Sequence, residues 1–120
     1  MRWIKLSVAL VGLIVGATAA RSETSPPSTM AEAEREWRKA DAILNATWEK
    51  CVDPDSATVQ SIAALRKAQQ AWIAYRDQNA RAYQLSQSSR QPLDDLYYVH
   101  ARAVMTMSRI AELKALFGCE

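Results

Sequence analysis

From residue 29 to its end, the chain contains one glycine, Gly118, and two prolines, Pro54 and Pro92. The residues between them are rich in alanine, glutamine, glutamate, arginine and leucine, which favour helix. No window alternates apolar and polar residues with period two for long enough to indicate a strand. A segment with so few helix breakers predicts an all-α domain.

Capping signals divide this segment into helices. Thr29 and Glu32 have the T-x-x-E spacing of a capping box, so the first helix is expected to begin near Thr29 and to end around residues 51–52. Asp53 then suits the N-cap of a second helix, and Pro54 suits its first turn, where the missing N–H costs nothing.

The second helix is expected to end where the stretch SQSSRQP, residues 86–92, breaks the helical pattern. The third helix then runs to Gly118, a typical C-terminal cap. Three helices with short turns predict an up-down-up antiparallel bundle. The short first connection also predicts that the first two helices are close neighbours.

Apolar stripes at helical spacing predict which faces are buried. The first helix is expected to bury Met30, Ala33, Trp37, Ala40, Leu44, Thr47 and Cys51. The second is expected to bury Val59, Ile62, Leu65, Trp72, Tyr75 and Ala82, with Gln69, Arg76 and Asn79 at the border. The third is expected to bury Leu93, Leu96, Val99, Ala103, Met107, Ile110, Leu113 and Phe117.

Residues 1–20 have the three parts of a secretory signal peptide. Arg2 and Lys5 precede an apolar run over 6–15, and Ala17 and Ala19 take the −3 and −1 positions of an A-x-A cleavage site. A transmembrane anchor is the alternative, but the apolar run is shorter than the roughly 20 residues that span a bilayer.

We therefore expect a signal peptide over 1–20, a flexible leader rich in Ser, Thr and Pro over 21–28, and a helical domain over 29–120. The mature chain is expected to be periplasmic or secreted and to contain no membrane span. Arg2 and Lys5 leave with the signal peptide, so 15 Lys+Arg against 13 Asp+Glu become 13 against 13. A neutral chain has no basic surface for nucleic acid and no acidic field to steer a cationic partner.

The two cysteines are expected to form a disulfide. Cys51 ends the first helix and Cys119 follows the third, so an up-down-up topology places them at the same end of the bundle. Export to an oxidising compartment favours their oxidation. The alternative is two separate thiols.

Residues suited to catalysis or metal binding are few. His100 is the only histidine, and a lone histidine on a helix is more often packed or exposed than a base. The chain has no E-x-x-H or C-x-x-C spacing. Asp94 and Asp95 begin the third helix, where carboxylates favour the helix dipole. We predict no enzyme activity, no metal and no cofactor.

The stretch AQQAWIAYRDQNA, residues 68–80, places Gln69, Trp72, Arg76 and Asp77 on one helix. Trp72 and Arg76 are four residues apart, so the guanidinium can lie over the indole, while Asp77 points about 100° away from Arg76. A buried arginine without partners is costly. Arg76 is therefore expected to meet a carboxylate, a backbone carbonyl or a helix end, or to extend its head to water.

Counting residues from the turns places Trp72 about level with Ala33 and Thr106, and Gln69 near the level of Arg109. Small neighbours leave room for an indole, so Trp72 is expected to be mostly buried, with the polar groups around it satisfying one another. A ligand site at the same residues is the alternative.

Three segments, DAILNATW, LRKAQQAWIAYRDQNA and TMSRIAEL, follow one another in this helical chain. Together they resemble the LprI-like lysozyme-inhibitor family over about residues 30–117. The family patterns D-x-x-L-N, L-x-x-x-Q-x-x-W-x-x-[YF]-R-D and T-x-x-R-x-x-x-L fall on Asp41, Leu44 and Asn45, then on Leu65, Gln69, Trp72, Tyr75, Arg76 and Asp77, and then on Thr106, Arg109 and Leu113.

Two features of the family pattern are absent from this sequence. Family members often have a cysteine three residues after the aspartate of R-D, paired with one before the last motif. Ala80 stands at the first position, and no cysteine occurs near His100 and Ala101. The stretch SQSSRQP replaces a glycine-rich insert before the third helix.

The resemblance implies a small exported protein that inhibits lysozyme by binding and occlusion. Lysozymes are often basic, so an inhibitor gains from acidity, which the neutral mature chain does not supply. A second reading is a periplasmic interaction or envelope-maintenance module in which the motif is structural and the partner is another envelope protein. An enzyme is the third reading. The sequence leaves the oligomeric state open.

Overall fold

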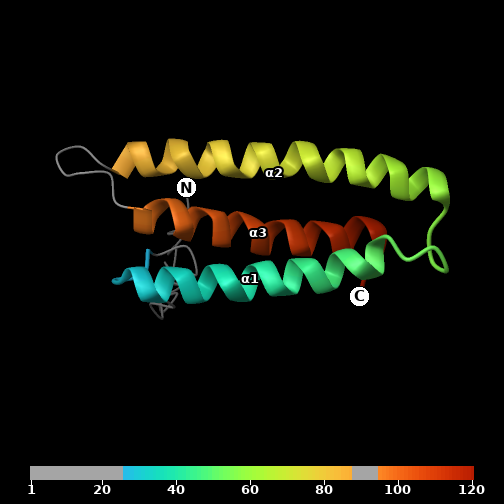
Figure 1. The fold of residues 1–120 in the computed structure, drawn as a ribbon, viewed down its shortest axis with the longest axis horizontal. Helices are drawn as coiled ribbons and strands as arrows, with labels where there is room; N and C mark the ends of the chain where they lie inside the picture. Colours follow the sequence, from blue (N-terminus) through green and yellow to red (C-terminus); the bar gives the residue numbers. More distant parts are fainter. Residues whose placement is uncertain (1–25, 88–94) are drawn as a thin grey trace, which may run out of the picture.

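The computed structural model of the protein describes residues 26–87 and 95–120, and within these ranges it contains three α-helices and no strand. Helix α1 spans Met30–Cys51, α2 spans Val59–Gln87 and α3 spans Asp95–Phe117. They run up, down and up, with α3 between α1 and α2 in the view of Figure 1. The predicted all-α, three-helix antiparallel bundle is confirmed.

Some predicted features lie outside the described residues. They are the signal peptide over 1–20, most of the leader over 21–28, the break over 86–92 beyond its first two residues, and the predicted places of Leu93 and Asp94. In the part that the structure describes, no helix combines the length and the apolar character needed to cross a membrane.

The start of α1 follows the predicted capping chemistry. The hydroxyl of Thr29 accepts a hydrogen bond from the backbone N–H of Glu32 at 3.2 Å. The carboxylate of Glu32 accepts from the backbone N–H and the hydroxyl of Ser28, at 2.9 and 3.0 Å. These bonds, the backbone one first, hold the pKa of Glu32 below its ordinary value. The side chains of Thr29 and Glu32 therefore both accept hydrogen bonds at the start of the helix, as in a capping box.

The predicted start of the second helix is wrong. Helix α2 begins at Val59, five residues after Pro54, and Asp53 does not cap it. Thr58 takes that role, since its hydroxyl accepts a hydrogen bond from the backbone N–H of Ser61 at 3.1 Å.

Asp53 is instead the first residue of a turn. Its side chain accepts a hydrogen bond from the backbone N–H of Asp55 at 2.9 Å. Its carbonyl accepts from the N–H groups of Ser56 and Ala57, both at 3.0 Å. Aspartate forms such local turns as readily as it caps helices, and here the turn prevails.

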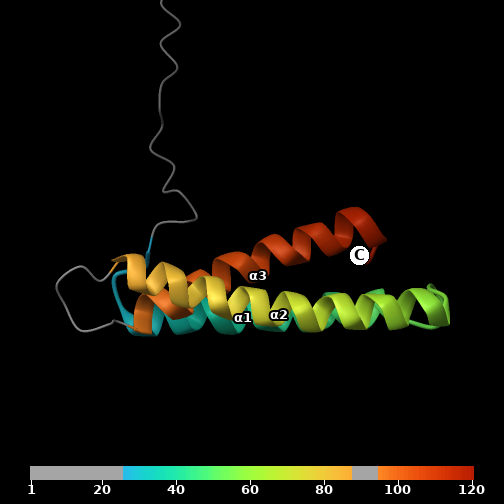
Figure 2. The same cartoon turned by 90° about the horizontal axis from the view of Figure 1, so that it is seen from above.

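Helix α3 holds the bundle together. It packs along both α1 and α2, whereas α1 and α2 scarcely approach each other. Figure 2 shows α3 rising away from α2 toward its C-terminal end. The prediction that the first two helices are close neighbours is therefore wrong. Their connection, residues 52–58, contains a turn of its own, which lets the helices separate.

The buried face of α1 agrees with the predicted stripe except at Met30, which is exposed, and Trp37, which is half-buried. The face of α2 differs. Val59 and Tyr75 are exposed at 82% and 60%, and the buried residues are Leu65, Gln69, Arg76, Ala80 and Gln84. Gln69 and Arg76, expected at the border, therefore lie in the interior, while Asn79 is half-buried and Ala82, expected to be buried, is exposed.

Helix α3 also buries polar side chains. Leu96, Ala103, Ile110 and Leu113 are buried as predicted, but Met107 and Phe117 are exposed. The buried polar side chains of this helix are those of His100, Thr106 and Arg109. The predicted apolar face was therefore only half of the face that packs.

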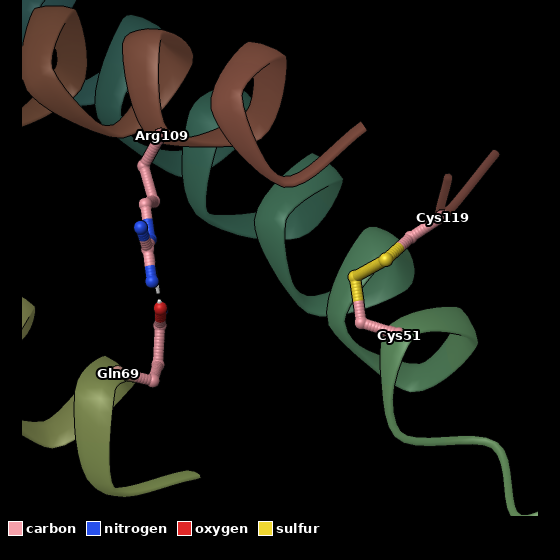
Figure 3. The surroundings of a disulfide bond; sticks show 4 residues. All are labelled: Cys51, Gln69, Arg109 and Cys119. Atoms are coloured by element: carbon pink, nitrogen blue, oxygen red, sulfur yellow. Dashed lines mark hydrogen bonds between the residues drawn. A yellow bond between two sulfur atoms is a disulfide. The ribbon is translucent and has the colours of Figure 1, made fainter. Parts of the chain in front are cut away.

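The predicted disulfide is confirmed. Cys51 and Cys119 are bonded, with their Cα atoms 4.9 Å apart, at the end of the bundle where α1 and α3 finish (Figure 3). Gly118, with a φ of 64°, turns the chain after α3, and its N–H donates to the carbonyl of Lys114 at 3.0 Å. Beside the disulfide, an apolar cluster comprises Leu44, Leu65, Ile110 and Leu113. We call this region the disulfide end.

Candidate functional site

Arg76 lies at the centre of the predicted motif. It is on α2 and is 6% exposed. Its Nε donates to the carboxylate of Asp77 at 2.9 Å. Its guanidinium carbon stands 5.0 Å from the ring centroid of Trp37 on α1 and 5.2 Å from that of Trp72 on its own helix. A charge buried this deeply needs such partners, and both predicted contacts of Arg76 are present.

Each of these two indoles also faces a second arginine. The guanidinium of Arg102 on α3 stands 4.0 Å from the ring centroid of Trp37, and that of Arg109 stands 5.7 Å from that of Trp72. The five side chains alternate in the order Arg102, Trp37, Arg76, Trp72 and Arg109. We call them the arginine–tryptophan stack.

Hydrogen bonds fix the two outer arginines of the stack. The Nε of Arg102 donates to Asp77 at 3.2 Å, so one carboxylate oxygen accepts from two arginines. The Nε of Arg109 donates to the side-chain oxygen of Gln69 at 3.0 Å (Figure 3), and another nitrogen of this guanidinium donates to Glu112. The predicted proximity of Gln69 to Arg109 is thus a direct bond between α2 and α3.

The stack joins all three helices. Trp37 comes from α1, Trp72 and Arg76 from α2, and Arg102 and Arg109 from α3. Because the backbones of α1 and α2 scarcely approach each other, the Trp37–Arg76 contact is a side-chain bridge across the gap. Each cation–π contact contributes roughly 0.5–2 kcal/mol, depending on its exposure to water.

The other predicted motif residues do not converge on the stack. Leu44 is in the apolar cluster, Asp41 is half-buried on α1, and Asn45 is exposed. Tyr75 points to solvent beside the stack residues of α2. Thr106 is fully buried, and its hydroxyl has no hydrogen-bond partner among the described residues. Trp72, expected to be mostly buried, is half-buried.

Sequence reasoning did not assign two members of the stack. Trp37 was expected only as a core residue of the first helix, and Arg102 was not singled out. Arg102 precedes Arg109 by seven residues, which is about two helical turns and puts both on one face. That repeat of arginine opposite a tryptophan-bearing helix is the signal that could have found it.

His100 lies apart from Arg76 and Asp77. It is 2% exposed, and its Nδ1 is 3.2 Å from a carboxylate oxygen of Glu36 on α1. A groove of about 400 Å³ includes His100 in its lining, and a different groove of about 430 Å³ includes Asp77. Neither of these two described grooves is lined by both side chains, so neither brings the imidazole to that carboxylate as a base and its orienting group would require.

Within residues 26–87 and 95–120, no three His, Cys, Asp or Glu side chains lie close enough together to bind a metal ion. Both cysteines in these ranges are in the disulfide.

These features define a small all-α protein with one disulfide across its bundle. The family model described as "Lysozyme inhibitor LprI" matches residues 18–113, and the chain belongs to this family. The chain is also 34% identical, over 97 residues, to "Uncharacterized protein R02472" of Rhizobium meliloti (strain 1021). That match covers 70% of this chain and 68% of the relative. No solved structure matches the chain.

Proposed function

We propose that the protein is an exported inhibitor of lysozyme that acts by binding and occlusion, without making or breaking a covalent bond. The observation that carries this proposal is the family match over residues 18–113. It gives a class of activity that the fold alone cannot supply, because a three-helix bundle serves many functions.

Export is the second part of the proposal. It rests on the signal-peptide pattern of residues 1–20, followed by a leader over 21–28 and the mature domain over 29–120. The Cys51–Cys119 disulfide fits an oxidising compartment, the periplasm or the exterior of the cell. A protein in either place can meet a lysozyme before the enzyme reaches the cell wall.

The test is the rate at which lysozyme clears a cell-wall suspension in the presence of the oxidised domain over 29–120. We expect a saturable slowing that persists at moderate salt, since the mature chain has no net charge to make the binding purely electrostatic. Reduced and alkylated protein is the control. No slowing at a large molar excess, across several types of lysozyme, would refute the proposal.

An envelope interaction module is the second candidate. It is favoured by the internal use of the motif, in which Arg76 bonds Asp77 and Gln69 bonds Arg109 within the bundle. On this view the motif organises the helices, and another envelope protein is the partner. A pull-down from envelope extract that enriches one protein, together with an inactive lysozyme assay, would select this candidate.

A further inference from the structure

A groove of about 630 Å³ lies between α1 and α3. Glu36 and Lys39 line it from α1, and Val104 and Met107 are among the residues that line it from α3. None of the α3 residues in the lining is charged. The groove therefore has an anion and a cation on one wall and an uncharged second wall.

The α3 wall is unusual for the surface of a helix in water. Over residues 103–111, the exposed side chains of α3 are those of Met107, Ser108 and Ala111, and none of them is charged. The side of a helix that faces water normally carries charged and polar residues. An uncharged exposed face with Met107 at its centre, 45% exposed, is the type of surface that another chain covers.

The α1 wall carries both signs of charge within one helical turn. The side chain of Glu36 is 48% exposed, and one of its oxygens is 3.2 Å from Nδ1 of His100. Lys39, three residues later, is exposed and forms no ion pair within residues 26–87 and 95–120. A twofold axis between these two residues sets each charge against the opposite charge of a second copy. The wall is therefore electrostatically complementary to itself.

The same axis also matches the α3 wall. Helices α1 and α3 run in the same direction, and the disulfide joins residues that are 68 apart in the sequence. At this offset, Val104 is about level with Glu36 and Met107 with Lys39. An axis that pairs Glu36 with Lys39 of a second copy therefore also pairs Val104 with Met107 of that copy. One register satisfies both the charges and the apolar side chains.

The size of this face suits a dimer of modest affinity. Helices α1 and α3 contain 22 and 23 residues, so each is about 33 Å long, and two neighbouring helices are about 20 Å across. The face offers roughly 650 Å² per copy, or about 1,300 Å² in all, which is near the lower limit for specific interfaces. A dissociation constant in the micromolar range is therefore expected.

We infer that the groove between α1 and α3 is the interface of a symmetric dimer, with a second copy of this chain as its occupant. Each α1 lies antiparallel to α1 of the other copy, and each α3 lies antiparallel to the other α3. The inference does not rest on the proposed function, because it uses no property of lysozyme.

The first test is sedimentation of the mature chain, residues 21–120, with its disulfide intact, from about 1 μM to 1 mM. We expect a monomer–dimer equilibrium. Met107→Glu places a charge in the apolar centre and should weaken dimerisation at least about tenfold. Ile73→Glu is the matched control, because Ile73 on α2 is 40% exposed and lines none of the described grooves. Its dimerisation should be unchanged, and both variants should keep the helical circular dichroism of the unaltered chain.

A second test exchanges the charges at the axis. Glu36→Lys leaves only cations there and Lys39→Glu only anions, so each variant alone should dimerise about tenfold more weakly at low salt. Mixed in equal amounts, the two variants should form a heterodimer with an affinity within about threefold of the unaltered dimer, because each charge again meets its opposite. Both effects should shrink at high salt. Heterodimer formation also shows that Glu36→Lys folds without its contact to His100.

The outcomes decide the inference without reference to inhibition. A chain that stays monomeric at about 1 mM overturns it. A dimer that Met107→Glu and the charge variants leave unchanged places the interface elsewhere and also overturns it. A monomer that uses Met107 to capture an envelope protein assigns the groove to a different chain, with the same result. A dimer that mixing the two charge variants restores supports the inference, whether or not the protein slows lysozyme.

Discussion

At the disulfide end, α1 and α3 close on apolar side chains and a covalent bond, whereas the middle of the bundle closes on the arginine–tryptophan stack. The cluster at the disulfide end, Leu44, Leu65, Ile110 and Leu113, is held by burial alone, which has no preferred direction. Trp72 touches both regions, since it packs against the apolar cluster and faces Arg76 and Arg109.

The difference teaches how a small bundle can leave two helices apart. Apolar contact falls off once surfaces separate, and the backbones of α1 and α2 scarcely approach each other. Long guanidinium and indole side chains reach farther, and they carry the bridge between α1 and α2. The stack depends on geometry and charge, while the disulfide end depends on volume and a covalent constraint. Substitutions should therefore affect the two regions by different rules.

The largest effect should come from breaking the disulfide end. Cys51→Ser with Cys119→Ser removes a cross-link between residues 68 apart in the sequence. We expect a loss of about 4 kcal/mol in the free energy of unfolding, or roughly 15–30 °C in melting temperature. Urea denaturation of both forms measures it. Thiol labelling of the unreduced, denatured protein is the control, and two labelled thiols per chain would contradict the disulfide itself.

The next effect should come from breaking the stack at its centre. Arg76→Ala removes contacts to Trp37, Trp72 and Asp77 at once, and we expect a loss of about 2–3 kcal/mol. Arg76→Met keeps much of the volume without the charge, so comparing the two by urea denaturation separates packing from electrostatics. A loss for Arg76→Met equal to that for Arg76→Ala would show that the charge, not the volume, holds the bridge.

A smaller change of opposite sign should sharpen the view of the interior. Thr106 is fully buried, and its hydroxyl makes no hydrogen bond among the described residues. Thr106→Val keeps the branched shape and removes that hydroxyl, and we expect a gain of about 1 kcal/mol. Thermal unfolding measures it. Thr106→Ser, which keeps the hydroxyl and loses a methyl group, should instead destabilise, and a destabilising Thr106→Val would contradict this reading.

The smallest effect should come from Glu32, which belongs to neither region. Bonds from Ser28 lower the pKa of this carboxylate in the folded protein, so its contribution is present above its ordinary pKa near 4.5 and is lost as the pH falls through the lowered value. Glu32→Gln should flatten the fall in stability below pH 4.5 slightly and change little at pH 7. Melting temperatures from pH 3 to 7 test this, and an unchanged acid slope would count against it.

Much of the fold was predictable because its signals are local. The side chain of Thr29 caps the start of α1 as the spacing indicated, and Gly118, with its positive φ, follows the end of α3. The disulfide followed from the order of the helices. The start of α2 was not predictable, since Asp53 can cap a helix or begin a turn and nothing local decides between them.

The contacts of the site were predictable only between residues of one helix, or between residues at the same height on two antiparallel helices. The Arg76–Trp72 and Gln69–Arg109 contacts follow from such counting. Such counting did not predict that Arg76 is buried and Tyr75 exposed, because a hydropathy scale treats a guanidinium as polar whatever lies next to it. Here Trp37 lies on another helix and makes the interior acceptable to that charge.

The weak approach of α1 to α2 has a consequence for the order of events in folding. The first hairpin of the chain shares little surface, so closing it gains little free energy before residues 95–117 are available. Cys119, the partner of Cys51, also lies near the C-terminal end of the sequence. The contacts that stabilise the bundle therefore join residues that are far apart in the sequence. We expect the emerging chain to stay extended until its last helix has been made. An unfolded chain can pass through a narrow channel, so this order of folding is compatible with the proposed export.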